Sequence, residues 1–130
     1  MRKTFLVCGS RDNASPDEVN AALNAIKAKH GSFALLSGAC PHPERHKDDS
    51  KTGFSADMLA IEWAIRNGIT FIGYPADWSQ GKSAGPRRNQ TMLMADPDGV
   101  IAFPGGAGTA DMIRRAEAQK FTVWKVGKHA

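Results

Sequence analysis

The stretch Val100-Ile101-Ala102-Phe103-Pro104-Gly105-Gly106-Ala107-Gly108-Thr109 decides the fold of this chain. Its first four residues form an apolar run that is typical of a short buried strand. The following segment, 110–120, contains neither glycine nor proline and predicts a helix. A glycine-rich turn therefore joins the end of a strand to the start of a helix, and Thr109 is a suitable N-cap for that helix.

This turn is suited to an anion. Gly105, Gly106 and Gly108 leave almost no side chain between the backbone and a ligand. The N–H groups at a helix N-terminus, at the positive end of the helix dipole, favour a phosphate or a carboxylate. The alternative is a tight turn that binds nothing, but a plain turn rarely needs three glycines.

The composition bounds the class of protein. A chain of 130 residues predicts a single domain, 1–130, and 42% hydrophobic with 23% charged residues is ordinary for a globular protein. No apolar run approaches the roughly 18 residues of a membrane span, and the run 5–8 is too short for a secretory signal. Two cysteines are too few for a disulfide framework, so we expect a cytoplasmic protein without a membrane partner.

The net charge of +4 is compatible with an anionic small ligand. No run of like charges is long enough for a nucleic-acid arm, and no basic stripe with interleaved aromatic residues is present. DNA is therefore not the expected partner.

Strands and helices alternate along the chain. The expected strands are 3–8, 32–37, 69–74, 100–103 and 121–126, and the expected helices are 15–30, 55–67, 86–95 and 110–120. Ser15 followed by Pro16 and Glu18 is a strong helix start, and Gly31 and Gly68 end two helices. The alternation predicts an α/β fold, a Rossmann-like doubly wound parallel sheet of about five strands with helices on both faces.

The second expected helix is apolar around most of its circumference. Its apolar residues are Met58, Leu59, Ile61, Trp63 and Ile65. A helix of this kind is covered on more than one side, so we expect a homo-oligomer, a dimer or larger, whose interface includes this helix.

In a doubly wound sheet, ligands bind beyond the carboxyl ends of the strands, where the winding reverses. With the strand order 3-2-1-4-5, the turn 9–12 meets the turn 104–109 there, and the segment 84–89 lies on the same edge. The expected ligand-binding residues are Gly9, Ser10, Arg11, Gly38, Arg88, Asn89, Pro104, Gly105, Gly106, Gly108 and Thr109. Backbone N–H groups and arginine suit phosphate, and an aspartate such as Asp57 suits ribose hydroxyls, so the expected ligand is a nucleotide-like small molecule.

Some of these residues also have a purely structural interpretation. Arg11 is equally well explained as a solvated side chain, and Asp57 as a residue that stabilises its helix through the dipole. Trp63 and Trp78 are expected to pack in the core rather than to stack on a base.

Cys40, His42 and His46 are zinc-type ligands. Their spacing matches no standard closed zinc site, and a fourth Cys or His is not nearby in the sequence. We expect no metal here and no cofactor elsewhere.

Five motifs follow one another over nearly the whole chain. They are Gly9-Ser10-Arg11-Asp12, Ser55-Ala56-Asp57 with Trp63-Ala64, Ala76-Asp77-Trp78, Ala84-Gly85-Pro86-x-Arg88-Asn89-x-x-Met92, and Phe103-Pro104-Gly105-Gly106-x-Gly108-Thr109-Ala110-Asp111-Met112. Together they resemble the YspA-like branch of the SLOG superfamily, which includes the Lonely-Guy and DprA/Smf proteins. The resemblance implies a Rossmann-like fold that binds nucleotides or nucleotide-derived ligands, often as a homodimer.

The chain departs from this pattern in two places. The loop 41–54 looks like an insertion and is a candidate cover for the cleft. Met112 stands where the Lonely-Guy enzymes, which cleave the N-glycosidic bond of nucleoside monophosphates, have a glutamate. The leading interpretation is therefore a nucleotide-binding domain, with a sensor as one role. The alternatives are a phosphoribohydrolase, with Asp57, Arg88 and Asp111 as candidate catalytic residues, and a DprA-like DNA-binding module.

Overall fold

The structure is a computed structural model that describes residues 2–39 and 52–129. Its elements are β1 (Lys3–Cys8), α1 (Pro16–His30), β2 (Phe33–Ser37), α2 (Ala56–Asn67), β3 (Thr70–Gly73), the 3-10 helix η1 (Trp78–Gln80), α3 (Ala84–Leu93), β4 (Gly99–Ala102), α4 (Ala107–Ala118) and β5 (Val123–Lys125). The five strands are parallel and lie in the order β3-β2-β1-β4-β5. The predicted fold class and strand order are confirmed.

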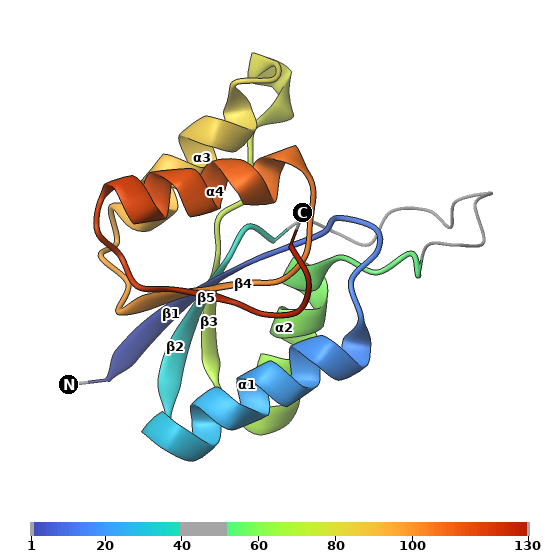
Figure 1. The fold of residues 1–130 in the computed structure, drawn as a ribbon, viewed down its shortest axis with the longest axis vertical. Coiled ribbons are helices and arrows are strands. Elements are labelled where there is room, and N and C mark those ends of the chain that lie inside the picture. Colours follow the sequence, from blue (N-terminus) through green and yellow to red (C-terminus); the bar gives the residue numbers. More distant parts are fainter. Residues whose placement is uncertain (1, 40–51, 130) are drawn as a thin grey trace.

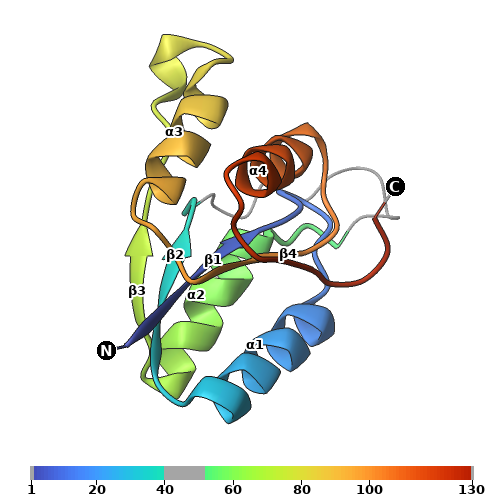
Figure 2. The same cartoon turned by 60° about the vertical axis from the view of Figure 1, so that its left-hand side comes forward.

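Helices cover both faces of the sheet. The helices α1 and α2 lie on one face, and α3 and α4 lie on the other (Figure 1). The view turned by 60° shows the same layers (Figure 2). Because β1 lies between β2 and β4, the winding reverses there, and the loops after β1 and β4 come together at the carboxyl edge.

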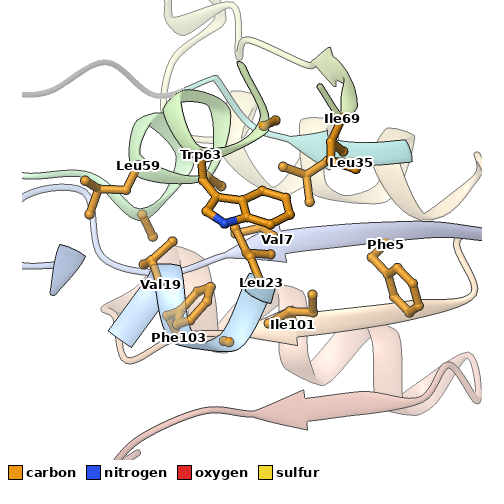
Figure 3. Packing of buried hydrophobic residues seen from close by; sticks show 14 of the residues in the cluster. Phe5, Val7, Val19, Leu23, Leu35, Leu59, Trp63, Ile69, Ile101 and Phe103 are labelled. Carbon is orange, nitrogen blue, oxygen red and sulfur yellow. The ribbon is translucent and has the colours of Figure 1, made fainter. Parts of the chain in front are cut away.

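The larger hydrophobic cluster lies between the sheet and the helices α1 and α2 (Figure 3). At its centre, Trp63 of α2 stacks on Phe33 of β2, with ring centroids 5.9 Å apart. The indole N–H of Trp63 donates a hydrogen bond of 2.8 Å to Asn24 Oδ1 in α1. Trp63 is therefore a core residue, as predicted.

The apolar residues of α2 are mostly covered within the single chain. Leu59, Ile61 and Trp63 are buried, because α2 packs against α1 and against three strands of the sheet. Of the five apolar residues named above for this helix, only Ile65 is exposed, with 65% of its surface accessible. The pattern that predicted an interface is explained by packing within the chain, and the homo-oligomer stays a prediction.

Two helices begin earlier than predicted. The helix α3 starts at Ala84 instead of Pro86, and α4 starts at Ala107. Thr109 consequently lies in the first turn of α4 and is not its N-cap, which is Gly106. The side chain of Thr109 is buried next to the place where a Cβ of Gly105 would lie. Within residues 2–39 and 52–129, no helix has the length and apolar character to span a bilayer.

Candidate ligand-binding site

The loops after β1 and β4 touch directly at the point where the winding reverses. The N–H group of Ser10 donates to the carbonyl of Pro104 at 2.9 Å. A Cβ on Gly105 would lie 2.9 Å from the backbone carbonyl carbon of Gly9 and 2.9 Å from the nitrogen of Ser10. Only glycine permits this contact, so Gly105 brings the two loops together.

A cleft of about 720 Å³ opens beside this contact, at the carboxyl edge of the sheet. Among the predicted site residues, those that line it are Gly9, Arg11, Gly38, Asp57, Arg88, Asn89, Gly106, Gly108, Thr109 and Asp111. Ser10, Pro104 and Gly105 are not among its lining residues and belong to the loop contact behind it. The structure therefore brings together residues from the loops after β1 and β2 and from the helices α2, α3 and α4, which are far apart in the sequence.

Arg88 reaches from α3 to the end of β2. Its Nη1 donates to the carbonyl oxygens of Gly38 at 3.0 Å and of Tyr74 at 3.2 Å. A Cβ on Gly38 would lie 2.9 Å from Cζ of Arg88 and 3.0 Å from Oδ2 of Asp57. The absence of a side chain at Gly38 therefore lets a cation and a carboxylate lie side by side in the wall of the cleft.

Cys8 is a buried residue in the wall of the same cleft. Burial raises the pKa of the Cys8 thiol to about 12; the nearby Asp57 adds to the rise and Arg88 opposes it. The thiol is therefore neutral at physiological pH and is not an activated nucleophile.

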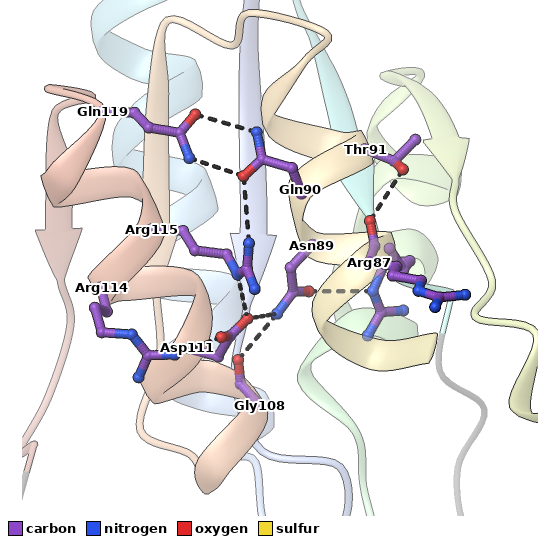
Figure 4. Close-up of polar contacts among 10 residues, drawn as sticks. Arg87, Asn89, Gln90, Thr91, Gly108, Asp111, Arg114, Arg115 and Gln119 are labelled. Carbon is purple, nitrogen blue, oxygen red and sulfur yellow. Dashed lines mark hydrogen bonds and ion pairs between the residues drawn. The ribbon is translucent and has the colours of Figure 1, made fainter. Parts of the chain in front are cut away.

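Asp111 is held by three side chains (Figure 4). Its Oδ1 accepts from Arg114 Nη2 at 2.6 Å, and its Oδ2 accepts from Arg115 Nε at 2.9 Å. The same Oδ2 accepts from Asn89 Nδ2 at 3.0 Å. Both oxygens are thus engaged by donors, so the geometry of Asp111 is that of a residue that positions its neighbours.

Asn89 connects Asp111 to two other parts of the cleft wall. Its amide nitrogen also donates to the carbonyl of Gly108 in α4 at 3.2 Å (Figure 4). Its Oδ1 accepts from Arg88 Nε at 3.1 Å. Asp111 therefore fixes Asn89, and Asn89 fixes both the first turn of α4 and the guanidinium of Arg88. Met112, at the glutamate position of the Lonely-Guy pattern, is 1% exposed and packs in the cluster with Met92 and Leu93.

The helix N-termini differ in how they are capped. The hydroxyl oxygens of Ser15 and Ser55 accept hydrogen bonds from the N–H groups of the first turns of α1 and α2. Among the described residues, no side chain caps the N-terminus of α3 or of α4. At Gly106, the N-cap of α4, a Cβ would meet no atom within 4 Å, so the start of this helix is open.

Trp78 differs from the prediction that it packs in the core. It belongs to η1, is 50% exposed and lines the cleft. The guanidinium carbon of Arg11 lies over its ring, 5.1 Å from the centroid. The signal for this position was an aromatic residue in a polar loop that follows a strand, at the edge where ligands bind.

The zinc-type residues Cys40, His42 and His46 lie outside the described residues, as does the part of the loop 41–54 before Thr52. The described end of that loop packs on the turn after β1. There, the N–H group of Gly53 donates to the carbonyl of Asp12 at 2.8 Å. The predicted cover of the cleft stays a prediction.

The chain is similar to a known protein in structure but not in sequence. No family model matches the chain, and no curated protein matches it. Among solved structures, the chain is similar to the "structure of Moco Carrier Protein from Chlamydomonas reinhardtii", with a TM-score of 0.65 and 20% sequence identity. The match covers 100% of this chain and 78% of that chain. At this identity the likeness shows a shared α/β fold.

Proposed function

We propose that this chain binds a nucleotide or a nucleotide-derived small anion in the cleft at the carboxyl edge of the sheet. The observation that carries the proposal is the uncapped, open N-terminus of α4 in the wall of a cleft that also holds Arg88. Helix N–H groups and a guanidinium together form a binding site for a phosphate. A volume of about 720 Å³ suits a ligand of nucleotide size.

The structural neighbour supports a binding role, because its name describes a carrier of a small molecule, Moco. The YspA-like resemblance supports a nucleotide-derived ligand. We propose in addition that the protein acts in the cytoplasm and that a sensor is one role of the binding. We also propose that the chain forms a homo-oligomer, a dimer or larger. Light scattering at high micromolar concentration tests the oligomeric state, and a monomeric mass would refute this part of the proposal.

Binding is tested by titration calorimetry with a panel of nucleoside mono- and diphosphates. We expect at least one of them to bind, and Arg88→Gln to weaken that binding about tenfold or more, the effect of losing a charged hydrogen-bond donor. Arg87→Gln is the matched control, because Arg87 is the next residue of α3 and its Nη1 instead donates to Gln80 Oε1. If no member of the panel binds the wild-type protein, the proposal is wrong.

N-glycosidic cleavage is the second candidate, and the observation that favours it is the carboxylate of Asp57 beside Arg88 in the cleft wall. A proton donor or acceptor is required for this reaction. Because Asp111 is held by three donors and Met112 has no proton to give, we expect little or no turnover. Incubation with nucleoside monophosphates tests this. Release of free base that disappears in Asp57→Asn would favour the enzyme.

A further inference from the structure

The cleft has an exposed aromatic ring in its wall. Trp78 is 50% exposed, whereas Trp63 in the core is 1% exposed. A Cβ on Gly85 would lie 3.2 Å from Cη2 of Trp78, so the edge of the indole rests on the first turn of α3. This contact holds the ring in place, and the guanidinium of Arg11 occupies one of its faces.

The pair joins two loops that are not neighbours in the sheet. Arg11 follows β1 and Trp78 follows β3, and β2 lies between these strands. The contact therefore passes over the end of β2, where Arg88 binds the carbonyl of Gly38. The cleft therefore contains the indole of Trp78 and the long side chain of Arg11. It also contains the first-turn N–H groups of α4 and the guanidinium of Arg88, which suit a phosphate.

We propose that Trp78 is the stacking surface for a planar heteroaromatic ring of the ligand, and that Arg11 leaves the indole when this ring binds and pairs with the ligand's anionic group. The inference rests on the proposed function and narrows it. The ligand is an anion that carries an aromatic base, and a sugar phosphate without a base lacks the group that Trp78 recognises.

The relative strengths of the two contacts favour this exchange. An exposed cation–π contact contributes roughly two- to fivefold to an equilibrium. Stacking of a base on an aromatic side chain contributes roughly 5- to 160-fold in affinity and is tolerant of base identity, because every base has a π-face. Arg11 gains a charged partner when it leaves the ring. The replacement of Arg11 by the ligand's ring on Trp78 therefore costs little free energy.

The test compares a nucleotide with its base-free counterpart. Calorimetry is done with AMP, GMP, CMP and UMP and with ribose 5-phosphate, on the wild-type protein and on Trp78→Leu, Trp78→Phe and Trp124→Leu. The last variant is the matched control, because Trp124 is 42% exposed on β5 and is not among the residues that line this cleft. Thermal unfolding verifies that each variant is folded.

We expect Trp78→Leu to weaken binding of the tightest nucleotide about fivefold or more and to change ribose 5-phosphate binding less than about twofold. Trp78→Phe retains most of the affinity, and Trp124→Leu retains all of it. The nucleotide quenches tryptophan fluorescence in the wild type and in Trp124→Leu, but not in Trp78→Leu. Equal nucleotide affinity in wild type and Trp78→Leu would overturn this inference alone. An equal loss for ribose 5-phosphate would also overturn it, and absence of nucleotide binding by the wild type would overturn the proposed function with it.

Discussion

The two faces of the sheet differ in how their helices begin. On one face, α1 and α2 each start behind a serine whose hydroxyl accepts a backbone N–H, with oxygen–nitrogen distances of 3.2 Å at Ser15 and 3.1 Å at Ser55. On the other face, within the described chain, α3 and α4 start without any side-chain cap, and both contribute their first turns to the cleft. At α3 the N–H group of Ala84 donates to the carbonyl of Gly81 at 3.2 Å, and Pro86 has no N–H group, so few donors are left. The start of α4 is therefore the place where the two faces differ most in helix donors without a side-chain cap.

An apolar cluster lies beneath the helices on both faces of the sheet, with Trp63 at the centre of one and Met112 in the other. The two faces differ in how their helices contact each other. Between α3 and α4, a polar network joins Asp111, Asn89 and Arg115, and it continues through Gln90 to Gln119, whose side chains exchange hydrogen bonds of 2.8 and 3.3 Å. Among the described residues, no buried side-chain polar atom lacks a partner. A satisfied polar network fixes one arrangement, and here it fixes the side chains of Asn89 and Asp111 in the wall of the cleft.

The largest expected effect separates two adjacent glycines of the α4 turn. Gly105→Ala is expected to lower the free energy of unfolding by about 3 kcal/mol, because its Cβ collides with backbone of the β1 loop. Gly106→Ala is expected to lower it by no more than about 1 kcal/mol, because the added atom enters open space and only the N-cap preference for glycine over alanine is lost. Urea unfolding measures both, and equal stabilities for the two variants would contradict the proposed loop contact.

The next effect concerns the wall of the cleft at Cys8. The unfolded thiol loses its proton near its ordinary pKa of 9.0 and the folded one near a pKa of about 12. Stability from this group is therefore complete below pH 9 and falls as the pH rises through this window, by up to about 1.4 kcal/mol per pH unit. Unfolding free energies at pH 8 and 10 measure the slope, and Cys8→Ala is expected to be less steep. An identical slope in both proteins would show that water reaches the Cys8 thiol and that burial does not raise its pKa.

The smallest expected effects on stability come from the serines at the helix starts. Ser15→Ala and Ser55→Ala are each expected to destabilise the fold by about 1 kcal/mol, the usual contribution of a serine N-cap. Ser83→Ala, at the start of α3, is the matched control and is expected to cost less than about 0.5 kcal/mol, because its hydroxyl makes no cap hydrogen bond. Thermal or urea unfolding of the three variants decides whether the two faces differ in this way.

The sequence signals that predicted the fold were local and strong. The apolar run before Pro104 and the serine start at Ser15 each determine a strand end or a helix start without help from distant residues. The confirmed strand order then follows from the rules for doubly wound sheets.

What the sequence did not predict depends on contacts between distant segments. Thr109 has the chemistry of an N-cap, but the helix begins earlier, because Gly106 starts it without a side chain. The pairing of Asp111 with Arg114 and Arg115 was readable from the i+3 and i+4 spacing. Its bond to Asn89 was not, because it joins two helices.

The most direct test of anion binding at the α4 N-terminus is to titrate wild type, Gly106→Val and Ala110→Val with the nucleotide that binds the wild type most tightly. Gly106 has a φ of −94° and open space around a Cβ, so valine is tolerated there while it covers the helix start. We expect Gly106→Val to bind at least about 1.5 kcal/mol more weakly, roughly tenfold, and to unfold at nearly the wild-type temperature. Ala110→Val, an exposed position of the same helix, is expected to bind as the wild type does. Unchanged affinity in folded Gly106→Val would contradict a ligand at the start of α4.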